Sequence, residues 1–250
     1  MAIRTRIGVM VPSTNTTCEA DFQLTAPADV TIHGHRMWMT NDGEGDDAMA
    51  AMNSEIESSA KYLSTANVDV IAYGCTTGSF YKGPGWDDEM VRLIEDASGK
   101  PAVATSPSVI DALRYFGAKK LSIASPYPKW NNEKLRVYME QSGFEVLNIE
   151  AEPVASEAGN QGINDQDPAV IVDFASKICH PDADVLFCSC TAWRSVEAVQ
   201  ELERITGKPV VTSNQATIWS VYRQISKPMQ IQGFGRLLNE PPSAITSMES

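Results

Sequence analysis

The chain has 250 residues, of which 43% are hydrophobic and 21% are charged, and its formal net charge is −12. These proportions are typical of a globular protein, and the negative charge argues against nucleic acid and anionic membranes as partners. No apolar run approaches the roughly 20 residues that span a bilayer, and the first residues lack the pattern of a signal peptide. We therefore expect a cytoplasmic protein.

Apolar, β-branched runs predict eight short strands. They occur at 6–11, 30–33, 68–73, 101–104, 120–124, 145–149, 184–188 and 209–212. Amphipathic segments between and after them predict helices at 46–66, 87–97, 107–116, 131–142, 168–178, 195–206 and 214–225. Continuous apolar strands that alternate with helices are typical of parallel sheets covered on both faces. The pattern therefore predicts the α/β class.

Three blocks of sequence recur in the same order. Residues 69–79 (DVIAYGCTTGS) resemble 184–195 (DVLFCSCTAWRS), so that Cys75 matches Cys190. The segment around Pro12 resembles the one around Pro126, and SGKPAVATSP at 98–107 resembles TGKPVVTSNQ at 206–215. Repeats with so long a period indicate a duplicated domain, although strands and turns of this type can also converge.

We expect two pseudo-symmetric, doubly wound parallel-sheet lobes with the active site between them. Residues 1–116 would form the N-terminal lobe, joined by a C-terminal helix at 214–238, and residues 117–213 would form the C-terminal lobe. The segment 239–250 is polar and rich in Pro and Ser, which predicts a mobile tail or an oligomer contact.

Polar side chains follow four of the predicted strands directly. They are Asn15, Cys75, Thr76, Thr77, Tyr127, Cys190 and Thr191. Ligands of parallel sheets bind beyond the carboxyl ends of the strands, so these four loops predict a single cleft. For Asn15 a helix-capping role is an equal alternative, and Tyr127 could also be a packing side chain.

Cys75 and Cys190 are the candidate catalytic residues. A thiol between a strand and a helix faces backbone N–H groups, which can lower its pKa from about 8.5 toward neutrality. Hydroxyls at Thr76, Thr77 and Thr191 suit a carboxylate, and equally the enediolate that forms when charge flows into it. A lone cysteine is more often a small buried hydrophobe, but the match across the repeat favours catalysis.

The other cysteines, at 18, 179 and 188, are expected in the core. An odd number of cysteines argues against a disulfide framework, and the C-x-C spacing of Cys188 and Cys190 is unusual for a metal site. The histidines, at 33, 35 and 180, are remote from both candidate thiols, which argues against a Cys–His dyad. No Gly-rich phosphate loop is present. We expect neither a metal nor a cofactor.

Several motifs together resemble the Asp/Glu racemase superfamily. They are IGVMVPSTNTT at 7–17, HRMWM at 35–39, VDVIAYGC at 68–75, ASPY at 124–127 and the second cysteine at 190. The most similar branch is maleate cis–trans isomerase, and CTTGSFYKG at 75–83 is similar to arylmalonate decarboxylase. The resemblance implies a small carboxylate or dicarboxylate substrate and no cofactor.

Within the isomerase branch, the resemblance implies that a Cys75 thiolate adds to a double-bonded carbon while Cys190 acts as acid and base. Asn15, Tyr127 and Asn160 would contact the two carboxylates. Alternatives are racemisation of an amino acid or related chiral acid by two cysteines, arylmalonate-type decarboxylation, and carboxylate binding without catalysis. A homo-oligomer, dimeric or higher, is the expected assembly.

Overall fold

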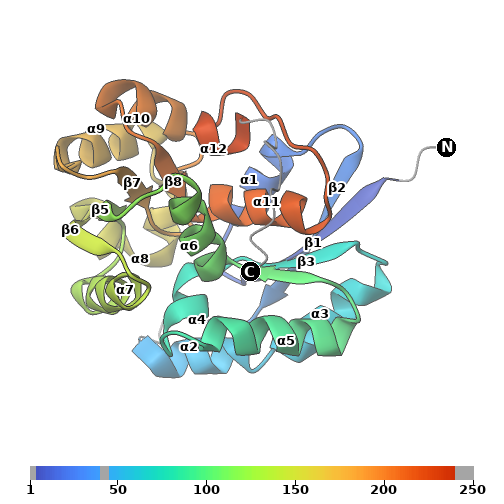
Figure 1. Ribbon diagram of the computed structural model, residues 1–250. Helices are drawn as coiled ribbons and strands as arrows, with labels where there is room; N and C mark the ends of the chain where they lie inside the picture. Colours follow the sequence, from blue (N-terminus) through green and yellow to red (C-terminus); the bar gives the residue numbers. More distant parts are fainter. Residues whose placement is uncertain (1–3, 40–44, 240–250) are drawn as a thin grey trace.

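The computed structural model describes residues 4–39 and 45–239, and it contains two four-stranded parallel sheets (Figure 1). The first sheet has the order β2-β1-β3-β4, and the second has the matching order β6-β5-β7-β8. The strands of the first sheet are β1 (Thr5–Pro12), β2 (Val30–Met37), β3 (Val70–Tyr73) and β4 (Ala102–Ala104). Those of the second are β5 (Lys120–Ser125), β6 (Glu145–Ala151), β7 (Val185–Cys188) and β8 (Val210–Thr212). The two-lobed α/β fold is thereby confirmed.

Helices flank both sheets. In the first half of the chain they are α1 (Cys18–Thr25), α2 (Gly45–Asn53), α3 (Ile56–Thr65), α4 (Thr76–Phe80), α5 (Trp86–Ser98) and α6 (Thr105–Tyr115). In the second half they are α7 (Lys129–Gln141), α8 (Pro153–Asp165), α9 (Pro168–Ile178), α10 (Val199–Thr206), α11 (Ser213–Gln224) and α12 (Gly235–Asn239). No helix among the described residues is long and apolar enough to cross a membrane.

Every predicted strand is present, whereas several helices differ from the prediction. The helix predicted at 46–66 is divided into α2 and α3, and the one predicted at 195–206 begins at Val199. A continuous helix at 214–238 is wrong, because α11 ends at Gln224 and α12 begins eleven residues later, at Gly235. Pro228 follows that end closely, and a proline disfavours helical geometry in the residue before it. The predicted tail lies outside the described residues except for residue 239.

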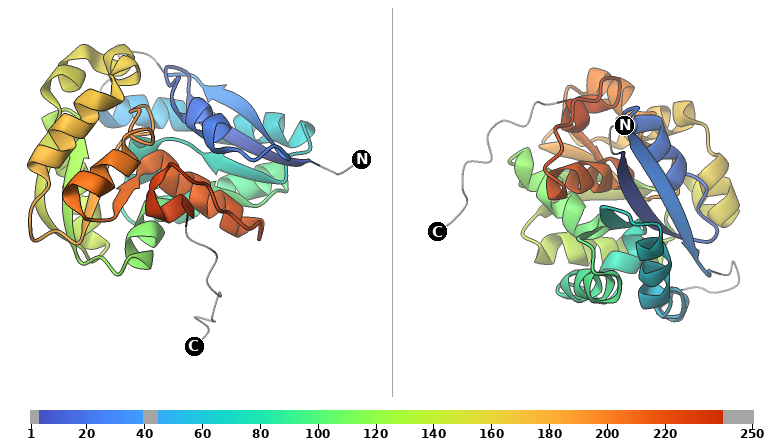
Figure 2. Two further views of the ribbon diagram at one scale, coloured as in Figure 1. Left: turned by 90° about the horizontal axis from the view of Figure 1, so that it is seen from above. Right: turned by 90° about the vertical axis from the view of Figure 1, so that its right-hand side faces the viewer.

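Helix α11 lies between the lobes. It contacts α1, α6, β3 and β4 of the first half and β8 of the second, and Figure 2 shows it beside both groups of strands. The Thr217 hydroxyl donates to the Thr105 hydroxyl over 3.1 Å, which ties α11 to α6. These contacts support the predicted return of the chain to its first lobe, while the exact domain boundaries remain a prediction.

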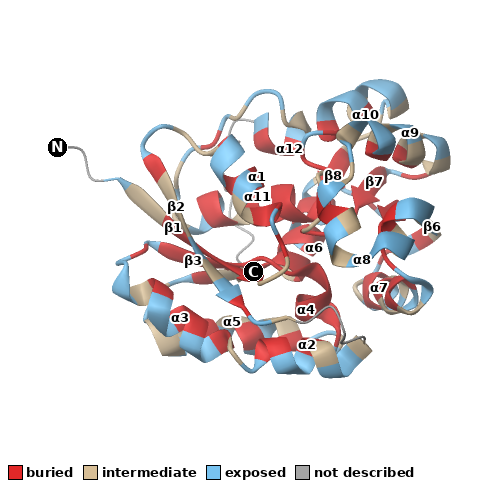
Figure 3. Cartoon of the chain, turned by 180° about the vertical axis from the view of Figure 1, so that it is seen from behind, coloured by how far each residue is buried: buried red, intermediate tan, exposed pale blue. Residues whose placement is uncertain are grey.

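One hydrophobic core extends through both lobes. The same cluster contains Val9 and Val70 from the first sheet together with Leu121 and Phe187 from the second. A smaller cluster around Met52 and Ile71 fills the space between the first sheet and helices α3 and α5. Figure 3 shows that the central strands are buried, whereas the edge strands β2 and β6 and the outer faces of the helices are partly exposed. Burial of this continuous apolar surface holds the strand ends of the two sheets close together.

The two matching segments also share an aspartate, which immediately precedes β3 and β7. Asp69 accepts a hydrogen bond from the backbone N–H of Arg6 at 2.7 Å. Asp184 accepts from the backbone N–H groups of Lys119 and Lys120 at 2.9 and 2.8 Å. Each carboxylate therefore satisfies N–H groups at the beginning of the neighbouring strand, and these bonds lower the pKa of Asp184.

We expect Asp184→Asn to reduce the free energy of unfolding at pH 7 by about 0.5–1 kcal/mol, a small effect because the group is exposed. A carboxyl whose pKa is lowered by folding stabilises the protein above its unfolded pKa of about 3.9. The difference from wild type should therefore disappear as the pH falls through the folded pKa. Urea unfolding from pH 2.5 to 7 measures it, with Asp182→Asn as the control. Equal effects of the two changes would contradict the prediction.

Candidate active site

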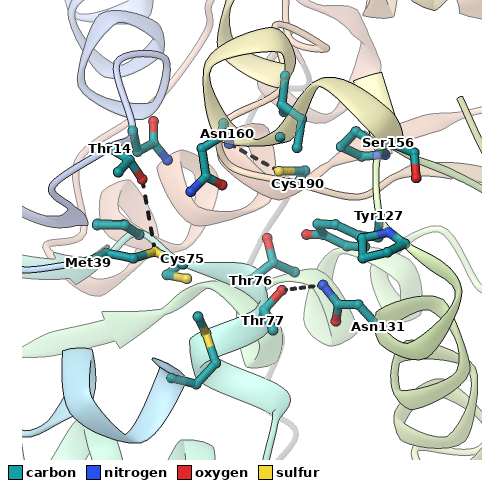
Figure 4. A pocket seen from close by; sticks show the side chains of 18 of the residues that line it. Thr14, Met39, Cys75, Thr76, Thr77, Tyr127, Asn131, Ser156, Asn160 and Cys190 are labelled. Atoms are coloured by element: carbon teal, nitrogen blue, oxygen red, sulfur yellow. Dashed lines mark hydrogen bonds between the residues drawn. The ribbon is translucent and has the colours of Figure 1, made fainter. Parts of the chain in front are cut away.

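A pocket of about 410 Å³ lies beyond the carboxyl ends of the strands, between the two lobes. Seven of the eight predicted site residues line it, and Figure 4 shows Cys75 and Cys190 in different walls. The seven are Asn15, Cys75, Thr76, Thr77, Tyr127, Asn160 and Cys190. Thr191 does not line the pocket. It is buried behind it, where its hydroxyl accepts a hydrogen bond from the Asn15 amide at 3.1 Å.

The two cysteines occupy equivalent turns. Cys75 caps α4, and its sulfur accepts a hydrogen bond from the N–H of Gly78 at 3.4 Å. The sulfur of Cys190 accepts from the N–H of Ala192 at the same distance. Backbone N–H groups therefore point at both thiols, and they favour the thiolate form of each.

Gly78 has to be a glycine because the Cys75 turn is crowded. A Cβ atom there would lie 2.1 Å from the Tyr73 hydroxyl oxygen and 3.2 Å from the Cys75 sulfur. The carbonyl of Gly78 accepts hydrogen bonds from Trp86 Nε1 at 2.9 Å and from Asn53 Nδ2 at 3.1 Å. The Tyr73 hydroxyl donates to Asn53 and also faces Cys75. These contacts fix the N–H groups that point at the first thiol.

The backbone of Cys190 is strained, because its φ is +149°, a value that L-residues seldom adopt. Its N–H donates to the Ser213 hydroxyl at 3.1 Å. The same hydroxyl accepts a hydrogen bond from Thr76 at 2.9 Å. Ser213, the first residue of α11, therefore connects the turn of one cysteine to the turn of the other.

The predicted fall of the thiol pKa toward neutrality is wrong. Burial raises the pKa of Cys75 to about 12, more than the Gly78 N–H and the Tyr73 hydroxyl lower it. Burial likewise raises the pKa of Cys190 to about 11, against the opposing effects of the Ala192 N–H and the Tyr127 hydroxyl. Loss of hydration of the thiolate outweighs the hydrogen bonds, because each side chain is at most 7% exposed.

Neutral polar groups surround the thiols. Among the described lining residues, none carries a charged side chain; the polar ones include Thr14, Asn15, Thr77, Asn131 and Asn160. An anion would therefore be held by hydroxyl, amide and backbone donors. Within the described ranges, no group of three His, Cys, Asp or Glu side chains is placed to hold a metal ion.

The geometry of Asn15 is compatible with both roles considered for it, and the ligand contact stays a prediction. Its side-chain oxygen accepts from the backbone N–H groups of Thr17 and Cys18, each at 2.9 Å, which caps α1. One N–H of its amide goes to Thr191. Since the amide has a second N–H and the residue lines the pocket, Asn15 can cap the helix and still donate to a ligand.

Helix α8, which the sequence pattern does not predict, supplies Asn160 and forms one wall of the pocket. Gly159 interrupts this helix with φ +66° and ψ −165°. Asn164 ties the helix to the first lobe, because its amide donates to the Thr14 carbonyl at 2.9 Å. Asn131 was also missed. It donates to the Thr77 hydroxyl at 2.9 Å, and its own carbonyl oxygen is buried without a partner.

Alkylation should reveal the raised pKa of both thiols. We expect the iodoacetamide labelling rates of Cys75 and Cys190 to rise about tenfold per pH unit from pH 7 to 9, because the thiolate fraction grows in that proportion well below the pKa. Peptide mass spectrometry measures each site, with a short cysteine peptide as the reference. A plateau below pH 8 at either cysteine would show that its pKa is near neutrality.

Comparisons with known proteins agree with this arrangement. The family model of arylmalonate decarboxylase (Amdase) matches residues 7–238. A maleate isomerase of Pseudomonas putida is 30% identical over 247 residues, which cover 94% of this chain and 97% of the relative.

Two solved structures share the fold over 94% of this chain, both with a TM-score of 0.85. One is the maleate isomerase Iso from Pseudomonas putida S16, a cysteine-to-alanine variant with maleate, at 26% identity and 97% coverage of that chain. The other is a cysteine-to-serine variant of the maleate cis–trans isomerase of Nocardia farcinica with a covalently bound succinylcysteine intermediate, at 25% identity and 98% coverage. The family match spans nearly all of the described sequence, and the chain therefore belongs to the arylmalonate decarboxylase family.

Proposed function

We propose that the protein is a cofactor-independent cis–trans isomerase of a small cis-dicarboxylate, and that maleate is its substrate or the simplest member of its substrate class. The observation that carries this proposal is the pair of thiols, Cys75 and Cys190, at equivalent turns of the two lobes around one pocket. The similarity to maleate isomerases supports it, as does the succinylcysteine found in one of them.

In the first half of the reaction, the Cys75 thiol gives its proton to solvent, and the resulting thiolate adds to one alkene carbon of the substrate. A carbon–sulfur bond forms, and the π electrons move to the second alkene carbon and into its carboxylate. The Cys190 thiol then gives its proton to that second carbon and becomes a thiolate. The backbone N–H groups of Ala192 and Trp193 and the Tyr127 hydroxyl stabilise the negative charge that remains on sulfur.

In the second half, rotation about the new carbon–carbon single bond brings the carboxylates to opposite sides. The Cys190 thiolate removes a proton from the carbon that it protonated, and the electron pair restores the double bond. The carbon–sulfur bond breaks, and Cys75 leaves as a thiolate, which takes back a proton from solvent. Both cysteines return to their starting states, so the reaction needs no oxidant, reductant or cofactor.

The neutral donors of the pocket suit this charge movement. The N–H groups at the start of α4, with Asn15 and Thr77, are proposed to bind one carboxylate, and Tyr127 and Asn160 the other. Thr76 and Thr191 are proposed to position the turns, because their hydroxyls bond to Ser213 and Asn15. Fixed dipoles stabilise the enediolate without a cationic group that would hold both dianionic isomers too tightly to release them.

Replacement of either thiol tests the proposal. We expect Cys75→Ser and Cys190→Ser each to lower kcat for maleate by at least about 1,000-fold, because a hydroxyl is a far weaker nucleophile and acid than a thiol. Proton NMR of the vinyl signals measures conversion to the trans isomer. Cys179→Ser, which changes a half-buried cysteine outside the pocket, is the matched control and should retain wild-type activity.

Other outcomes identify the alternatives. Near-normal turnover by Cys75→Ser would refute the two-thiol mechanism and favour decarboxylation through one cysteine. Deuterium entering the α-carbon of a chiral acid in D₂O, without cis–trans conversion, would indicate a racemase. Binding of dicarboxylates with no turnover of any of these substrates would indicate a binding protein.

The same proposal includes a cytoplasmic location and a homo-oligomeric state. All five cysteines are free thiols, and a mechanism that uses two of them suits the reducing conditions of the cytoplasm. A homo-oligomer remains the expected assembly, which light scattering of the purified protein would measure.

A further inference from the structure

Asp21 is a buried carboxyl group that the proposed reaction does not use. It lies on α1, is 2% exposed, and faces the first turn of α11. Within the described residues, its side chain has one hydrogen-bond partner, the Asn214 amide, whose Nδ2 donates to Asp21 Oδ2 over 2.7 Å. A buried carboxylate normally has a cation or several donors around it. A single amide donor is unusual for an ionised group.

The Asn214 side chain lacks a hydrogen-bond donor for its oxygen atom, just as Asp21 has few donors. Its Nδ2 also donates to the carbonyl of Thr191 at 2.9 Å, so both amide hydrogens are used. Its side-chain oxygen Oδ1 is buried and accepts no hydrogen bond from the part of the chain that the structure describes. Turning the amide around would place that oxygen against the Thr191 carbonyl, so the orientation is fixed. Leaving a buried acceptor without a donor is destabilising, and native proteins seldom tolerate one.

We propose that Asp21 is a neutral carboxylic acid that forms a two-bond ring with the amide of Asn214, and that this pair positions the Cys190–Thr191 backbone. In the ring, the Asp21 O–H donates to Asn214 Oδ1 while Asn214 Nδ2 donates to the other carboxyl oxygen. The extra proton supplies the missing donor for the amide oxygen. It also removes the need for a cation beside the carboxyl group.

The groups facing Asp21 are consistent with a neutral acid. From the segment before α10 come Arg194 and Glu197, which are paired with each other at 2.8 Å. On its own helix lie Cys18 and Glu19, and Glu19 is paired with Arg36 of β2. Helix α11 contributes the uncharged Asn214. Burial is the main cause that raises the pKa of Asp21 to about 8; the Asn214 amide opposes it, Glu197 adds to it, and Arg194 opposes it least.

The pair acts on the reaction site through one peptide group. Asn214 holds the Thr191 carbonyl, and its neighbour Ser213 holds the Cys190 N–H. The peptide group between Cys190 and Thr191 comes directly after the strained φ of Cys190. That backbone conformation persists only if its surroundings fix it. Ionised Asp21 would repel Asn214 Oδ1 and loosen one of the two clamps. Asp21 is therefore a positioning residue for Cys190.

The isosteric change Asp21→Asn tests whether the carboxyl group of Asp21 is neutral or ionised in the folded protein. An amide at position 21 can still donate to Asn214 Oδ1 and accept from Nδ2, so it imitates the protonated acid permanently. In wild type, the unfolded Asp21 loses its proton near pH 3.9 and the folded one near pH 8, so stability from this group falls as the pH rises between these values. We expect the Tm of Asp21→Asn to rise relative to wild type by about 3–5 °C per pH unit over that range and then level off.

Two controls complete the experiment. Asp29→Asn should differ from wild type by a Tm shift that does not change between about pH 4 and pH 8, because the bond with Lys227 lowers the pKa of Asp29 and so confines its titration to lower pH. An infrared difference spectrum between wild type and Asp21→Asn at pH 6.5 should contain the carbonyl band of a protonated carboxylic acid, which is distinct from a carboxylate band. These readouts do not depend on the proposed reaction. In an activity assay, the decline of wild type above about pH 8 should be absent in Asp21→Asn.

A carboxylate band at pH 6.5 would overturn the proposal. A Tm difference that is independent of pH, with Asp21→Asn the less stable protein throughout, would overturn it as well, because it would show an ionised carboxylate that stabilises through its charge. Asn214→Leu keeps the size of the side chain but removes the ring. With the partner amide gone, it should lower Tm in both the wild-type and the Asp21→Asn background, and an unchanged Tm in either background would contradict the pairing.

Discussion

The hydroxyl of Ser213 is the point at which the two halves of the site are joined. It accepts the N–H of Cys190 from one turn and the hydroxyl of Thr76 from the turn that carries Cys75. The position of each thiol relative to the other therefore depends on the first residue of one helix. That helix can hold them because it is buried between the lobes, against α6 and β4 on one side and β8 on the other. Packing far from the pocket thus sets the geometry inside it.

Burial gives the site its chemical character. A dry, uncharged pocket keeps both cysteines protonated, although backbone N–H groups stand ready to stabilise a thiolate at either. In such a pocket, the free energy of forming each thiolate depends strongly on the charged and polar groups beside the sulfur. A substrate that takes up or gives back charge during the reaction then meets donors that are already oriented and need no reorganisation.

The sequence predicted those parts of the molecule that short-range patterns encode. Short apolar runs mark the central strands, and the two cysteines could be paired because the residues around them recur. Helix α8 could not be found in this way, since Gly159 and Gly162 weaken its helical pattern and its role depends on contacts with the first lobe. The contact of Asn214 with Asp21 joins residues 193 positions apart, which no local pattern reveals. The thiol pKa was predicted wrongly for the same reason, because burial is a property of the folded molecule.

A tyrosine hydroxyl lies beside each of the two thiols, but the two tyrosines come from different positions in the fold. Tyr73 belongs to the strand that leads directly to Cys75, whereas the position equivalent to Tyr73 in the second half is Cys188. Cys190 instead meets Tyr127, which comes from the end of the neighbouring strand β5. A mutation of either tyrosine therefore leaves the strand and turn that carry the other thiol unchanged. If the two halves arose by duplication, each thiol would in this way have acquired its own tyrosine hydroxyl. Divergence of one half need not then have disturbed the hydroxyl beside the other thiol.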